Sequence, residues 1–155
     1  SEKFGLARYD AIQPPYSLAR RRDYEKELIM VVKKYGFGVT SYSPLGGGFL
    51  TGRYSKDKAP DSKRVETTKT RYFKERNFRI IEVLEKLAND KGVTVAQVEL
   101  AWVLSRETIT APIIGVNTVE QLEHNLTSLD IRLSDDELRQ LNKISDWTEM
   151  DIEAR

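Results

Sequence analysis

Residues 39–54 read Val-Thr-Ser-Tyr-Ser-Pro-Leu-Gly-Gly-Gly-Phe-Leu-Thr-Gly-Arg-Tyr, and this stretch decides how the chain is organised. A short apolar strand runs directly into a turn that contains Gly46, Gly47 and Gly48. Because glycine has no Cβ, the turn can adopt positive φ and approach a ligand closely, with free amide hydrogens directed at oxyanions. Arg53 adds a guanidinium that can donate to the same anion. The stretch predicts a phosphate-binding turn, with a plain flexible loop as the alternative.

A second loop of the same type occupies residues 110–126, where an apolar strand passes through one glycine into a helix. Thr118 and Gln121 have the spacing of a capping box, in which the two residues satisfy each other's backbone amides. The first turn of a helix leaves amide donors unpaired and carries the positive end of the dipole, so it attracts phosphate without a lysine. Asn117 and Gln121 lie at this position and are predicted to contact an anion.

The composition is typical of one globular domain. Of 155 residues, 39% are hydrophobic and 32% are charged, with a net charge of +1. Acidic residues closely follow the basic runs, so we expect no nucleic acid partner. The absence of cysteine excludes thiol catalysis and disulfides, and with a single histidine we expect no metal site. No apolar run approaches membrane-spanning length and no signal peptide is recognisable, so we expect a cytoplasmic protein without a membrane partner.

The remaining sequence alternates between strands and helices. Helical spacing of apolar residues, bounded by glycines or capping pairs, predicts helices over 24–35 with Asp23 as its cap, from Phe73 to Gly92, and after Thr94 and Ser134. Residues 55–70 have no apolar pattern and are predicted to form a long mobile loop. The strands are expected at residues 8–13, 38–41 and 111–114.

Strands separated by helices predict an α/β fold with a parallel sheet, because parallel neighbours need a crossover connection. Three strands cannot close a barrel, and an open three-stranded parallel sheet leaves unpaired edges that isolated proteins avoid. In a (β/α)₈ barrel, a phosphate site is commonly built from the loops after strands seven and eight. Because a complete barrel takes roughly 250 residues, we interpret the chain as the closing part of one.

Three segments together resemble one known family. They are residues 11–18 (Ala-Ile-Gln-Pro-Pro-Tyr-Ser-Leu), 41–54, and 112–115 with the continuation 121–126 (Gln-Leu-Glu-His-Asn-Leu). In order and spacing they resemble the carboxyl-terminal half of the aldo-keto reductases, which are NADP(H)-dependent (β/α)₈ barrel enzymes, in the branch of bacterial reductases and potassium-channel β-subunits. The resemblance implies that residues 1–155 form strands six to eight, with their helices, of a TIM barrel domain whose N-terminal half is absent.

The resemblance also implies roles for single residues toward NADP(H). Gln13 would hydrogen-bond the nicotinamide carboxamide and Tyr42 would stack on the ring, although Tyr42 also fits ordinary barrel packing. The segment along the pyrophosphate would consist of Ser43, Pro44, Leu45, Gly46 and Gly48, with Arg53 as a basic phosphate contact. The adenosine end and its 2′-phosphate would be held by Gly115, Asn117, Gln121 and Asn125.

Two cofactor positions depart from the family pattern. His124 stands where this branch usually has a glutamate that faces the adenine amine, and it is retained as a cofactor-binding candidate. Asn117 replaces a common serine, threonine or arginine near the 2′-phosphate, so the preference for NADP over NAD stays open. Gln121 also fits a plain helix cap. Arg71 could reach the cofactor from the long loop, but we favour a plain surface arginine.

The family's catalytic residues have no counterpart in this chain. In the family, a tyrosine tuned by lysine, aspartate and histidine protonates the carbonyl oxygen while hydride leaves the nicotinamide. These four residues come from the first half of the barrel, so no catalytic residue is predicted here.

Two hypotheses from different classes follow. The first is the cofactor-binding part of an NADP(H)-dependent reductase of aldehydes or ketones, and the second is a non-catalytic nucleotide-sensing or interaction module. A barrel that binds another phosphate-bearing ligand, such as flavin, is a weaker third. The expected partners are a small carbonyl substrate and the missing N-terminal half of the barrel, with a homo-oligomer as a further option.

Overall fold

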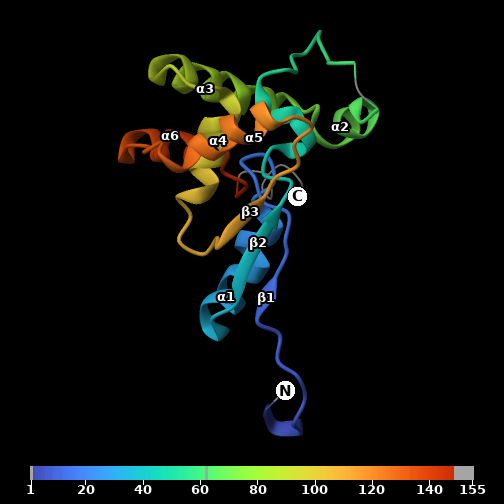
Figure 1. Ribbon diagram of the computed structural model, residues 1–155, viewed down its shortest axis with the longest axis vertical. Coiled ribbons are helices and arrows are strands. Elements are labelled where there is room, and N and C mark those ends of the chain that lie inside the picture. The colour runs from blue at the N-terminus through green and yellow to red at the C-terminus, as the bar shows by residue number, and fades with distance from the viewer. Residues whose placement is uncertain (1, 62, 149–155) are drawn as a thin grey trace.

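A three-stranded parallel sheet forms the centre of the chain. The computed structural model describes residues 2–61 and 63–148, and its strands β1 (Ala11–Ile12), β2 (Gly38–Tyr42) and β3 (Ala111–Ile113) lie in the order β1-β2-β3 (Figure 1). Ala11 lies opposite Gly38, and Tyr42 lies opposite Ile113. The α/β class and the parallel sheet are thus confirmed, although β1 is shorter than the strand predicted over residues 8–13.

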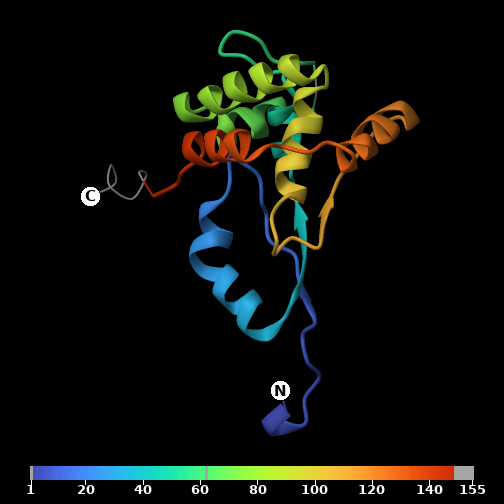
Figure 2. The same ribbon diagram turned by 90° about the vertical axis from the view of Figure 1, so that its left-hand side faces the viewer.

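Most helices gather around the carboxyl ends of the strands, whereas the helix between β1 and β2 lies beside the strands, and the N-terminal segment extends away (Figures 1 and 2). The capping boxes predicted at Thr94 and Ser134 are both present. The helices are α1 (Ile29–Tyr35), α2 (Val65–Tyr72), α3 (Glu75–Lys91), α4 (Val95–Leu104), α5 (Val119–Leu126) and α6 (Asp135–Ile144). Shorter turns are η1 (Glu2–Phe4), η2 (Tyr24–Leu28, a π-helical turn before α1), η3 (Gly46–Thr51) and η4 (Thr127–Leu129).

Two local predictions are wrong. Asp23 is not a helix cap, because its own φ and ψ are helical at −60° and −41° and its carboxylate pairs with Arg20 at 3.3 Å instead. The loop predicted over residues 55–70 ends early, because α2 begins at Val65. Thr68 and Tyr72, one turn apart on α2, are buried, and this contact with the rest of the fold stabilises a helix that shows no apolar periodicity.

An aromatic cluster fastens the glycine-rich turn to the helices. Phe49, fully buried in η3, contacts the rings of Tyr54, Tyr72, Phe73 and Phe78 at centroid distances of 5.5 to 5.8 Å. Aromatic pairs at this separation contribute about 0.5–1.5 kcal/mol each beyond the area that they bury. The cluster therefore holds the turn after β2 in place from α2 and from the start of α3.

A polar network fastens the loop after β1 to α6. Arg21 donates to Glu25 at 2.8 Å and to the carbonyl oxygen of Asn142 at 2.9 Å, and Tyr16 donates to Glu25 at 2.6 Å. Trp102 on α4 stacks on Tyr16 and donates to the Asn142 side chain at 3.0 Å. Burial alone would raise the pKa of Glu25, but the hydrogen bonds from Arg21 and Tyr16 lower it. The network thus keeps a charged carboxylate inside the fold.

Glu99 is a fully buried carboxyl on α4. It accepts a hydrogen bond from the backbone amide of Leu18 at 3.0 Å, and its second oxygen has no hydrogen-bond partner among the residues that the structure describes. Burial raises the pKa of Glu99 to about 8, although the Leu18 hydrogen bond and the charge of Arg21 act in the opposite direction.

Within residues 2–61 and 63–148, no helix combines the length and apolar character needed to cross a bilayer.

Glu99 should make the stability of the protein fall as the pH rises. The folded state holds the Glu99 proton up to about pH 8 whereas the unfolded chain loses it near pH 4.5, so the free energy of unfolding should decrease between these values. The slope is at most about 1.4 kcal/mol per pH unit. Glu99→Gln keeps an acceptor for Leu18 and cannot ionise, so urea denaturation should show a flatter profile. Glu82→Gln, exposed on α3, is the control with an unchanged slope, and equal slopes for Glu99→Gln and wild type would contradict the account.

Candidate functional site

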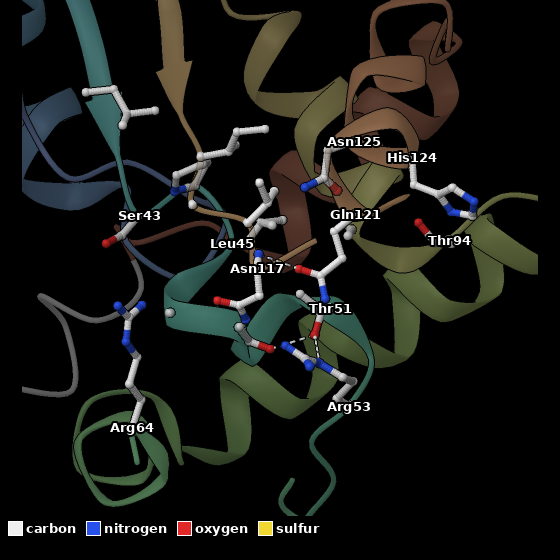
Figure 3. Close-up of a pocket in the computed structure, with 18 of the residues that line it drawn as sticks. Ser43, Leu45, Thr51, Arg53, Arg64, Thr94, Asn117, Gln121, His124 and Asn125 are labelled. Carbon is white, nitrogen blue, oxygen red and sulfur yellow. Dashed lines mark hydrogen bonds between the residues drawn. The ribbon is translucent and has the colours of Figure 1, made fainter. Parts of the chain in front are cut away.

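The two glycine-containing loops meet because β2 and β3 are neighbours. Tyr42 pairs with Ile113 at the carboxyl ends of the strands, so the next residues, Ser43 and Ile114, begin two adjacent loops. Both residues line one cleft of about 820 Å³ (Figure 3). This volume lies within the range of roughly 300–1,000 Å³ that is usual for small-molecule sites. The cleft is therefore the candidate functional site.

The glycine-rich turn adopts the predicted backbone conformation. Gly46, Gly47 and Gly48 have φ values of 58°, 65° and 99°. The amides of Gly46 and Gly48 donate to Ser43 O at 2.9 Å and to Leu45 O at 3.0 Å, so the expectation that they are free to bind an anion is wrong. A Cβ at Gly48 would lie 3.4 Å from Nη2 of Arg53. An added Cβ would make only ordinary van der Waals contact with the guanidinium, so the positive φ is what favours glycine at position 48.

The orientation of Arg53 is set by a threonine. Arg53 Nε donates to the hydroxyl of Thr51 at 3.2 Å, and this hydroxyl donates to the carbonyl oxygen of Gly48 at 2.7 Å (Figure 3). Among the described residues, Arg53 donates only through Nε. Its terminal Nη groups are therefore available to an anion in the cleft.

The second loop is partly closed by its own side chains. Thr118 accepts a hydrogen bond from the Gln121 amide at 3.3 Å, as predicted, but the Gln121 side chain accepts from Asn117 N at 2.9 Å and not from Thr118. A hydrogen bond from its own backbone amide, followed by one from Thr118, lowers the pKa of the Glu120 carboxyl. Several amides at the start of α5 are thus already paired. The expectation of a helix terminus with unpaired donors is correct only in part.

The helix α5 presents Gln121, His124 and Asn125 to the cleft, because residues three and four apart share one face of a helix. Figure 3 shows His124 and Thr94 at the end of the cleft opposite Ser43 and Arg64. The His124 carbonyl oxygen accepts from Gln97 Nε2 at 2.9 Å, which ties α5 to α4.

Ten of the thirteen predicted cofactor residues line the cleft and three do not. Gln13 is exposed after β1, and Tyr42 is 36% exposed at the end of β2, where its amide donates to Pro14 O at 3.0 Å. Gly46 is buried in the turn, where an added Cβ would meet Phe49 at 3.5 Å. The ten that line the cleft are Ser43, Pro44, Leu45, Gly48, Arg53, Gly115, Asn117, Gln121, His124 and Asn125.

Sequence reasoning missed the basic residues at the start of α2. Lys63 and Arg64 line the cleft, but the sequence around them was interpreted as a solvated loop. The two adjacent basic residues, Lys63 and Arg64, were the signal in the sequence that could have indicated an anion-binding position. Other lining residues that were not named as site candidates are Gly47, Thr51, Thr94, Ala96, Ile113, Ile114, Val116 and Glu120.

Comparison with known proteins assigns the family. Residues 2–146 match the model of the aldo/keto reductase family, and the chain belongs to this family. It is 31% identical over 162 residues to a putative voltage-gated potassium channel subunit beta of Schizosaccharomyces pombe, and 38% identical over 132 residues to the uncharacterized oxidoreductase YrpG of Bacillus subtilis. It is also 30% identical over 138 residues to L-glyceraldehyde 3-phosphate reductase of Escherichia coli O157:H7.

The chain spans less than half the length of these relatives. The alignments cover 99%, 85% and 84% of this chain, in the order given above, but only 47%, 39% and 40% of the related proteins. The chain thus belongs to a family with oxidoreductase members, and its own structure contains a small parallel sheet with helices.

Gly48 should be intolerant of any side chain. Gly48→Ala forces a Cβ onto a backbone at φ 99°, so we expect a loss of about 1–3 kcal/mol in the free energy of unfolding, measured by urea denaturation. Gly115→Ala is the matched control, because an added Cβ there meets no atom within 4 Å and φ is not positive. Equal stabilities of the two variants would show that the turn is not constrained as described.

Proposed function

We propose that the cleft binds the dinucleotide NADP(H), and that the chain is the cofactor-binding C-terminal portion, strands six to eight, of an aldo/keto reductase barrel. The observation that carries the proposal is the meeting of two loops, each after one of two adjacent parallel strands, in a single cleft rich in cationic side chains. Apart from His124, the ionisable side chains that line the described cleft are Arg53, Lys63, Arg64 and Glu120. This excess of positive charge favours an anionic ligand.

The residues fit a dinucleotide placed along the length of the cleft. Gln121, His124 and Asn125 offer amide and imidazole groups to the adenosine end, and Arg53 reaches over the turn toward the pyrophosphate. The nicotinamide would then lie toward Ser43, beside the strand ends that carry Tyr42 and Gln13. Glu120 also lines the cleft, so its negative charge offsets part of the positive charge there, and the choice between NADP and NAD depends on Asn117 and its neighbours.

The proposed reaction is the reduction of an aldehyde or ketone to an alcohol. The bound cofactor supplies a hydride to the carbonyl carbon. The residues of this chain bind the cofactor and fix its orientation. Holding the nicotinamide close to the carbonyl contributes part of the rate enhancement. The general acid that protonates the carbonyl oxygen is assigned to the N-terminal part of the barrel, since no residue of this chain matches it.

A second candidate function is a nucleotide-sensing module without catalysis. The observation that favours it is the similarity to the S. pombe relative, which is named as a putative voltage-gated potassium channel subunit beta. Both functions require dinucleotide binding, but only the reductase oxidises NADPH in the presence of aldehydes. Retained NADPH binding without turnover of a panel of aldehydes, in protein that holds the complete barrel, would favour the module.

The missing half of the barrel is the proposed partner of an apolar stripe on α5 and η4. Val119, Leu122, Leu126 and Leu129 recur every three or four residues and are 38 to 66% exposed. Such a contiguous apolar surface is unusual in a monomer. We assign it to packing against barrel helices outside this chain, which agrees with the partial coverage of the relatives.

Arg53 should contribute directly to dinucleotide affinity. Arg53→Ala removes a charge-assisted hydrogen bond, so we expect NADPH binding, followed by its fluorescence, to weaken by about 1–3 kcal/mol. Arg139→Ala, which removes an exposed arginine that pairs with Asp136 on α6, is the control and should leave the dissociation constant unchanged. An unaltered dissociation constant in Arg53→Ala would remove this residue from the site.

The stripe should be required for association with the rest of the barrel. Leu126→Lys places a charge on the stripe and should strongly reduce the recovery of a co-expressed polypeptide that carries the preceding strands, measured by affinity pull-down. Glu82→Lys, exposed on α3 and outside the stripe, should retain association. If the chain instead forms a dimer that Leu126→Lys dissociates, the stripe belongs to a second copy and the assignment is wrong.

A further inference from the structure

A second, smaller cavity continues from the cleft. It has a volume of about 260 Å³, and it shares Ser43, Gly47, Lys63 and Arg64 with the cleft. Since Ser43 and Arg64 lie at the end of the cleft opposite α5, the smaller cavity opens beyond the end at which the nicotinamide is placed (Figure 3). Its outer wall is α2, the helix that the sequence did not predict.

The charge in this cavity is of one sign. Lys63, Arg64 and Arg71 line it, and no carboxylate does so among the described residues. The acidic residue of α2, Glu66, lies outside the cavity and pairs with Lys69 at 3.5 Å. Lys63 and Arg71 make no hydrogen bond or ion pair within the described residues, so their positive charges are available to a ligand.

The Tyr72 hydroxyl provides a second observation that points to a ligand. Tyr72 is 7% exposed and lines the cavity, yet its hydroxyl forms no hydrogen bond with the described residues. Burial raises the pKa of Tyr72, with Arg20 and Arg71 opposing this rise, so the hydroxyl keeps its proton and acts as a donor. Its ring is fixed by stacking on Phe49 at 5.6 Å. A hydroxyl donor that lines the cavity without a partner among the described residues, next to the cations of Lys63 and Arg71, is suited to an oxyanion.

We propose that this cavity holds the anionic group, a phosphate or a carboxylate, of the carbonyl substrate, with Lys63 and Arg71 as charge partners and the Tyr72 hydroxyl as a hydrogen-bond donor. The inference rests on the proposed function, because the position of the nicotinamide makes this cavity the one next to the reacting carbonyl. The substrate class is therefore small aldehydes or ketones that carry an acidic group. The E. coli relative is named L-glyceraldehyde 3-phosphate reductase, and the substrate in that name is a phosphorylated aldehyde.

Titration calorimetry with a non-reacting probe tests the assignment. Glycerol 3-phosphate carries the phosphate and lacks the carbonyl, and glycerol is its neutral counterpart. Glycerol 3-phosphate should bind protein saturated with NADPH, whereas glycerol should not. Arg71→Gln should weaken this binding about tenfold, the scale of one charged hydrogen bond, and Tyr72→Phe should weaken it several-fold while keeping the ring stack. Lys69→Gln, on the same helix but outside both cavities, should stay within about twofold of wild type.

Three results would overturn the proposal. They are unchanged probe binding in Arg71→Gln, exclusion of the probe by NADPH, and loss of NADPH affinity in Tyr72→Phe, since the last two assign the cavity to the dinucleotide. If NADPH itself does not bind, the proposed function fails separately. Glycerol 3-phosphate is then titrated into wild type and the variants without nucleotide, which tests the cavity alone. A tenfold loss of probe affinity in Arg71→Gln supports an anion site, and an unchanged affinity refutes it.

Discussion

The parallel pairing of β2 with β3 is the constraint on which the rest of the structure depends. Tyr42 opposite Ile113 sets the register, and both strands then end at the same edge of the sheet. Because parallel strands point in one direction, the loops that follow them must leave side by side. Residues about seventy positions apart in the chain thus line one cleft. A shift of one residue in this register would turn every side chain of β2 to the opposite face.

The turn after β2 is held by the aromatic cluster on one side and faces the cleft on the other. Phe49 anchors it within the aromatic cluster, while Arg53, aligned by Thr51, lies next to Gly48. Rigid placement lowers the entropy that a ligand loses on binding, because the turn is ordered before the ligand arrives. In contrast, the cationic side chains of α2 are exposed, so they supply charge and adjust their positions to the ligand.

Local signals predicted much of this fold, and tertiary contacts decided the remainder. The capping box at Thr94 and the positive φ at Gly48 follow from residue chemistry within a few positions, so they were predictable. Helix α2 was not predictable, because the burial of Thr68 and Tyr72 depends on contacts distant in sequence, among them the stacking of Tyr72 on Phe49. The Gln121 side chain accepts a hydrogen bond from Asn117 N instead of from the predicted Thr118, and this partner is determined by the geometry of the loop. The basic residues of α2 joined the site for the same non-local reason.

The central claim is that the cleft between the ends of β2 and β3 receives a nicotinamide dinucleotide. Backbone amide NMR spectra recorded during NADPH addition test it most directly, because every residue except proline reports separately. The account predicts saturable shifts at Gln13 and otherwise confined to residues 42–53, 63–64 and 113–125. Shifts spread over the outer faces of α3 and α6, or none at all at millimolar NADPH, would contradict it.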